Sequence, residues 1–145
     1  MGEEVLGVII ATEYGRIPVL HCNLIFTPQM MIVAKKGMSK EIAGLMVGGA
    51  VGQWLAIRSD KKRVQELKQP EVEEILKANK KNYRIFYTEI LKAEMKKLSR
   101  FSWPYSTEIK FTTDKKKHKF KLKNVKFEEA VELFQAVLPH KISVK

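Results

Sequence analysis

The last third of the chain carries the pattern that most restricts its fold: two extended segments joined by a charged turn, followed directly by an amphipathic helix. Residues 107–113 and 118–125 alternate apolar with polar side chains, and residues 114–117 form a polar turn between them. Residues 126–138 then repeat apolar side chains at helical spacing, and Pro139 follows. The apolar stripe consists of Phe127, Ala130, Val131, Phe134, Val137 and Leu138. We therefore predict a β-hairpin covered by a C-terminal helix.

The first 35 residues predict three more strands. Residues 5–12 are rich in β-branched side chains, residues 17–27 alternate, and residues 30–34 form a short apolar run. In the second of these segments, His21 and Asn23 fall on one face. The opposite face carries Leu20, Cys22, Leu24 and Phe26. A meander of three strands is the simplest arrangement of these segments.

A helical insertion is predicted between the early and late strands, over about residues 39–79. Ser39 can cap a helix in which residues 42–57 are apolar except for Gln53, and residues 60–68 continue it. Pro70 then starts a short helix over residues 71–78. The apolar helix would be about 24 Å long, which is shorter than the roughly 30 Å hydrocarbon core of a bilayer. We expect it to pack on the sheet or on a second subunit, with a membrane as the alternative. The residues that would make this contact are Gly44, Gly48, Gly52 and Trp54.

Residues 82–87 are extended, whereas the periodicity of residues 89–98 fits a helix and a strand equally well. The order of elements predicts a mostly β domain with some α structure, spanning residues 1–145. We expect an antiparallel strand barrel or sheet, capped by the C-terminal helix of residues 126–138.

Three stretches resemble the pleckstrin-homology-like domains of prokaryotes, a group that includes GRAM-type domains. They are NLIFTPQMMIVAKK (23–36), NYRIFYTEILKAEMKK (82–97), and EIKFTTDKKKHKFKL leading into FEEAVELFQAVLP (108–139). The resemblance implies that residues 91–97 form a strand. Eukaryotic relatives hold inositol phosphates with basic residues around the first hairpin. Here that turn is Glu-Tyr-Gly-Arg (13–16), with one cation, so we do not expect phosphoinositide binding.

The formal net charge is +11, and most of the cations follow residue 34. The late hairpin is especially basic, and its alternation directs several lysines outward. Such a ridge can bind an anionic surface, or it can simply protect strands from edge-to-edge association. The candidate contact residues are Lys110, Lys115, Lys116, Lys117, Lys119, Lys121 and Lys123. Single-stranded nucleic acid is not favoured, because Phe120 should face inward and no aromatic side chain interleaves the lysines.

An aromatic segment precedes this hairpin. Phe101, Trp103 and Tyr105 lie within five residues. Aromatic side chains in a loop either contact a partner or cover one end of a barrel, and both alternatives stay open.

No catalytic, metal or cofactor site is predicted. Cys22 is the single cysteine and lies in an apolar run, while the adjacent His21 should point to the opposite face of its strand. No histidine has metal-ligand spacing with another ligand, and no phosphate-binding glycine loop is present. The lone cysteine and the acidic Met-Gly-Glu-Glu start predict a cytoplasmic protein, with membrane association as the alternative.

Together these features predict a non-enzymatic binding or scaffolding module that associates with itself. A protein partner is a further candidate. The alternative is a peripheral membrane protein that contacts anionic lipid through the glycine-rich helix and the lysine ridge. Non-specific nucleic-acid binding is a weaker alternative, because it depends on charge alone.

Overall fold

The computed structural model describes residues 2–4, 6–14, 20–35, 66–78, 81–123 and 125–144. The glycine-rich segment of residues 42–57, with the contact predicted for it, lies outside the described residues. The early elements are β1 (Gly2–Glu4), β2 (Gly7–Tyr14), β3 (Leu20–Phe26), β4 (Met30–Lys35), β5 (Glu66–Lys68), α3 (Gln69–Ala78) and β6 (Tyr83–Phe86). The late elements are β7 (Ile90–Lys97), β8 (Tyr105–Thr113), β9 (Lys117–Lys123), α4 (Phe127–Val137) and β10 (Ile142–Val144).

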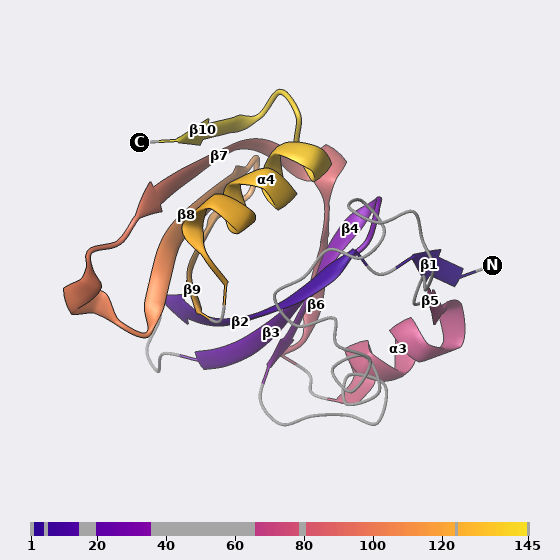
Figure 1. The fold of residues 1–145 in the computed structure, drawn as a ribbon. Helices are drawn as coiled ribbons and strands as arrows, with labels where there is room; N and C mark the ends of the chain where they lie inside the picture. The colour runs from indigo at the N-terminus through magenta and orange to yellow at the C-terminus, as the bar shows by residue number, and fades with distance from the viewer. Residues whose placement is uncertain are drawn as a thin grey trace.

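Eight strands form one open sheet in the order β10-β7-β8-β9-β2-β3-β4-β6. The early meander of β2, β3 and β4 joins the late hairpin of β8 and β9 through an antiparallel β2–β9 pairing. Helix α4 lies against the concave side of this curved sheet, and α3 lies beside the early strands (Figure 1). The predicted mostly β fold with a C-terminal helix is therefore correct at this level.

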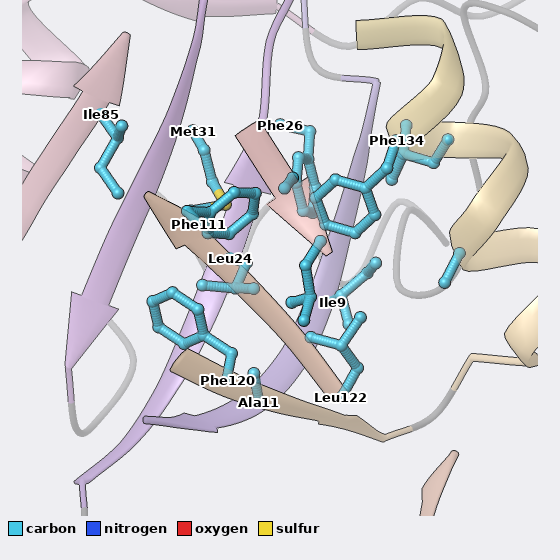
Figure 2. Packing of buried hydrophobic residues seen from close by; sticks show 14 of the residues in the cluster. Ile9, Ala11, Leu24, Phe26, Met31, Ile85, Phe111, Phe120, Leu122 and Phe134 are labelled. Atoms are coloured by element: carbon cyan, nitrogen blue, oxygen red, sulfur yellow. The ribbon is translucent and has the colours of Figure 1, made fainter. Parts of the chain in front are cut away.

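The main core fills the space between the curved sheet and α4. Phe134 of α4 makes edge-on ring contact with Phe26 of β3, with 5.1 Å between ring centroids. Its ring centroid also lies 5.7 Å from that of Phe111 on β8, and Phe111 in turn meets Phe120 of β9 at 6.1 Å. Figure 2 shows these rings converging from α4 and both halves of the sheet. Large aromatic side chains bury much apolar area, so this cluster holds the two halves together.

A second apolar cluster lies on the other face of the early strands, where α3 packs. Val72 and Ile75 are fully buried there, three residues apart on one helical face. Their partners from the sheet are Val8, Ile25, Met30, Ile32 and Ala34. Every residue of β4 is consequently buried, which is why residues 30–34 form a continuous apolar run rather than an alternation; only Lys35 at the end of the strand is charged.

Asn82 connects the end of α3 to the end of β4. Its amide nitrogen donates to the Ile75 carbonyl oxygen at 2.7 Å, and its amide oxygen accepts from the Lys35 backbone N–H at 2.6 Å. The first of these bonds satisfies a carbonyl near the helix end, where backbone acceptors lack a partner within the helix.

The predicted hairpin and its alternation are confirmed. His118, Phe120 and Leu122 of β9 are buried, while the lysines between them face outward. Ile109 and Phe111 of β8 are buried on the same inner side. Only one face of β8 and β9 therefore belongs to the core.

Residues 90–97 are a strand, as the resemblance implied for residues 91–97. Simple alternation groups Leu91 with Ala93 and Met95 on one face, and this placement of Leu91 is wrong. The β7–β8 register shifts between Ile90 and Lys92, which indicates a bulge. Because one extra residue reverses the alternation, Ile90 is buried and Leu91 is 61% exposed.

Three short strands, β1, β5 and β10, were not predicted. Residues 66–68, expected to continue a helix, instead form β5, which pairs with β1. Pro70 fits only in the first turn of α3, so the residues before it are free to pair as a strand. At the other end, β10 pairs in parallel with β7, so the sheet is mixed rather than purely antiparallel. A three-residue strand is too short to show alternation in the sequence.

The aromatic contact of α4 gives a direct test of the fold. Phe134→Ala should lower the free energy of unfolding by about 3–5 kcal/mol, because it removes a fully buried ring and leaves a cavity. Urea denaturation measures the change. The neighbouring exposed Gln135→Ala is the control and should change stability by less than about 0.5 kcal/mol. Equal effects of the two substitutions would contradict this account of the core.

Candidate functional site

The lysine ridge predicted on the late hairpin lies on the outer face of the sheet. Lys117, Lys119, Lys121 and Lys123 alternate with the buried residues of β9, and Lys110 of β8 is the register partner of Lys119. Lys115 and Lys116 are exposed in the turn. The outward positions expected from alternation are thus confirmed, but the structure divides these lysines into groups with different surroundings.

Two lysines of the ridge are ion-paired. The Lys110 ammonium lies 3.4 Å from a carboxylate oxygen of Glu94, and the Lys119 ammonium lies 3.1 Å from one of Glu108. These side chains border a shallow hollow of about 160 Å³ over β7 and β8. The hairpin sequence has no acidic residue after Asp114. The carboxylates that pair with the lysines come instead from Glu94 of β7 and Glu108 of β8. Carboxylates therefore compensate the charges of Lys110 and Lys119, although the exposed Lys96 also borders the hollow.

Three other lysines of the ridge lie over tyrosine rings: Lys116 of the turn, with its ammonium 5.7 Å from the Tyr83 ring centroid, and Lys121 and Lys123 on the outer face. The Lys121 ammonium is 4.4 Å from the ring centroid of Tyr14, and the Lys123 ammonium is 5.9 Å from that of Tyr105. Within the part of the chain that the structure describes, neither lysine forms an ion pair with a carboxylate. We call Tyr14, Tyr105, Lys121 and Lys123 the tyrosine–lysine patch.

The tyrosines of the patch come from strands far apart in the sequence. Tyr14 ends β2 and Tyr105 begins β8, yet their rings meet edge-on with centroids 6.4 Å apart. The Tyr105 hydroxyl is hydrogen-bonded to the Thr12 hydroxyl at 2.8 Å, and the latter lies 3.1 Å from Nδ1 of His21. Burial, followed by the neighbouring Tyr105, raises the pKa of Tyr14. Both rings are half-buried, so their neighbours restrain the orientation of the two side chains.

The three residues of the predicted aromatic loop have different environments in the structure. Phe101 is 90% exposed and Trp103 is 82% exposed, between β7 and β8. Such exposure excludes the alternative that these two rings cover the core. Tyr105 was grouped with them, but it belongs to β8 and to the tyrosine–lysine patch. Arg100 lies beside the loop, with its guanidinium carbon 5.9 Å from the Phe101 ring centroid.

A buried polar cluster at the inner face was not predicted. Lys35 is ion-paired with Glu13, and the Tyr83 hydroxyl donates to the other oxygen of that carboxylate at 2.8 Å. Nδ1 of His118 lies 3.3 Å from the Tyr83 hydroxyl. Burial, with Lys116 and Lys81 nearby, lowers the pKa of Lys35 to about 8. The four side chains come from β2, β4, β6 and β9, so no local sequence motif predicts that they form a cluster. The sequence signal for this cluster was a charged residue at the end of each of two apolar strands, Glu13 in β2 and Lys35 in β4.

The cysteine and histidine that are adjacent in the sequence lie on opposite faces of β3. Cys22 is buried, and burial raises the pKa of its thiol to about 12. His21 is exposed on the opposite side of the strand. Across the described ranges, no cluster of three His, Cys, Asp or Glu side chains could hold a metal ion. In the same residues, no helix has the length and apolar character needed to cross a membrane.

The chain matches no family model, and searches of curated proteins and of solved structures found no match.

The buried ion pair gives a prediction about stability. Glu13→Gln should lower the free energy of unfolding by about 3–5 kcal/mol, because it leaves the Lys35 ammonium buried without a countercharge. The double substitution Glu13→Gln with Lys35→Met removes both charges and should cost clearly less than the two single changes added together. A double-mutant cycle in urea at neutral pH measures this difference. Additive effects would show that the pair is not coupled.

Proposed function

We propose that this chain is a non-enzymatic binding module of pleckstrin-homology-like architecture whose partner is an anionic macromolecule. The architecture is supported by the early meander, the late hairpin and the C-terminal helix, in the order that the resemblance implies. A fold of this kind does not by itself assign a function, so the argument for the partner depends on the surface.

The observation that carries the proposal is the contrast between two pairs of lysines in the ridge. Lys110 and Lys119 are neutralised by carboxylates, whereas Lys121 and Lys123 have only tyrosine rings against them in the described structure. A cation without a countercharge is available to an anion, and the net charge of +11 favours the approach of one. The exposed loop of Phe101 and Trp103 directly precedes Tyr105 and so extends this surface.

The lysines of the patch can be tested with a pair of matched variants. Lys121→Gln with Lys123→Gln should weaken binding to long-chain inorganic polyphosphate roughly 30-fold, since each lysine contributes about 1 kcal/mol against an anionic surface. The control is Lys92→Gln with Lys96→Gln, which removes the same charge from exposed positions on β7. Isothermal titration calorimetry measures both. Equal weakening in the two variants would mean that only net charge matters, and no binding by the wild-type protein would reject the proposal.

Self-association is a second candidate, and the exposed aromatic loop favours it. Large exposed aromatic side chains mark interaction surfaces, and tryptophan is enriched among residues that dominate interface energy. Two copies meeting through Phe101 and Trp103 would remove both rings from water.

Sedimentation velocity at micromolar concentration tests this candidate. We expect a dimer or larger species for the wild-type protein and a monomer for Phe101→Ser with Trp103→Ser. Leu91→Ser is the control, because Leu91 is also an exposed apolar side chain but lies on β7. A monomeric wild-type protein would reject self-association.

A further inference from the structure

The tyrosine–lysine patch has two properties that a simple polyanion does not need. Its cations have no carboxylate partner among the described residues, and two aromatic rings lie beside them on the same face. The sequence argued against single-stranded nucleic acid because the only aromatic side chain interleaved in the lysine strand, Phe120, faces inward, and it is indeed buried. The missing rings are supplied instead from β2 and β8, which flank β9 on either side.

We infer that the anionic partner of this patch is a single-stranded nucleic acid. Its bases stack on Tyr14 and Tyr105, and its phosphates bind the ammonium groups of Lys121 and Lys123. This inference rests on the proposed function and names its partner. Base–aromatic stacking tolerates any sequence, because every base has a π face, and a basic track follows the backbone.

The tyrosine rings are already in contact with lysine ammonium groups, so a base that stacks on a ring must replace the ammonium there. Each lysine ammonium lies over or beside a tyrosine ring, an arrangement held by cation–π attraction of modest strength at a surface site. A lysine is a flexible point charge, so its ammonium can turn to a phosphate oxygen while the base takes the ring face. The Tyr105 ring stays in place through the bond of its hydroxyl to Thr12.

The surroundings indicate the path of the strand. Glu94 and Glu108 pair with Lys110 and Lys119, so these two lysines are less available to phosphate than Lys121 and Lys123. The exposed rings of Trp103 and Phe101 lie beyond Tyr105 along the chain and offer further stacking surfaces. We therefore place the nucleic acid along β9 and toward the aromatic loop.

The geometry favours a single strand over a duplex and over a membrane. A duplex hides the faces of its bases and presents only base edges and phosphates, so the tyrosine rings would gain nothing. A membrane would use the lysines and the exposed rings of Phe101 and Trp103, but the half-buried rings of Tyr14 and Tyr105 on the sheet face would not reach its apolar layer. Only unpaired bases use both parts of the patch.

The test compares three probes with the full chain: a fluorescein-labelled thymidine oligomer, inorganic polyphosphate, and vesicles of phosphatidylglycerol. We expect the oligomer to bind most tightly, with an affinity that falls steeply between about 50 and 200 mM salt. Tyr105→Leu and Tyr14→Leu should each weaken oligomer binding about 5- to 150-fold, as the loss of one stacked base predicts. Tyr14→Phe keeps the ring and should bind the oligomer nearly as the wild-type protein does. Tyr105→Phe also keeps the ring but loses the bond to Thr12, so it should weaken binding less than Tyr105→Leu does.

The same tyrosine variants should leave polyphosphate binding unchanged, because that polymer has no bases. A second reading comes from fluorescence: the oligomer should quench the wild-type emission and quench it less in Trp103→Phe, a measurement that needs no change to Tyr105. Leucine and phenylalanine variants that bind the oligomer alike, together with no loss of quenching in Trp103→Phe, would overturn the inference. Tighter binding to polyphosphate or to vesicles would overturn it too, but would leave the anionic-partner proposal standing. No binding to any probe would reject both.

Discussion

The ring of Phe134 lies between Phe26 and Phe111, and through this contact helix α4 touches both halves of the curved sheet at once. The early meander and the late hairpin share only the β2–β9 pairing along their backbones. The apolar cluster under α4 adds side-chain contacts between them, and hydrophobic burial of this kind is the main favourable term in folding. The position of every strand that carries the candidate site therefore depends on this core.

The two halves of the sheet differ in how many faces they bury, and that difference locates the candidate site. The early strands are covered on one side by the main core and on the other by the cluster that includes α3. The late hairpin is covered on its inner side only, so its outer positions are free for charged side chains. A binding surface on β9 is thus compatible with the fold, whereas the same lysines on β4 would be buried at high cost.

Much of the fold was predictable, because the spacing of apolar side chains within single segments indicates strands and helices. The alternation of Phe120 and Leu122 with lysines indicated a half-buried strand, and the stripe that contains Phe134 indicated the covering helix. The errors fall where a single residue or a very short segment decides the structure. One bulged residue turned Leu91 outward, and β5 and β10 are each three residues long. Neither a bulge nor a three-residue strand leaves a periodic signal.

The sequence by itself determined the class of the fold and the outward direction of the late lysines. These follow from spacing along one segment, which side-chain periodicity records. The tertiary structure alone decided which lysines are neutralised, which lie over tyrosine rings, and which acid, base and hydroxyl groups share the buried cluster around Glu13. Those neighbours come from different strands, such as Tyr14 and Tyr105, and only the register of the folded sheet brings them within a few ångströms of each other.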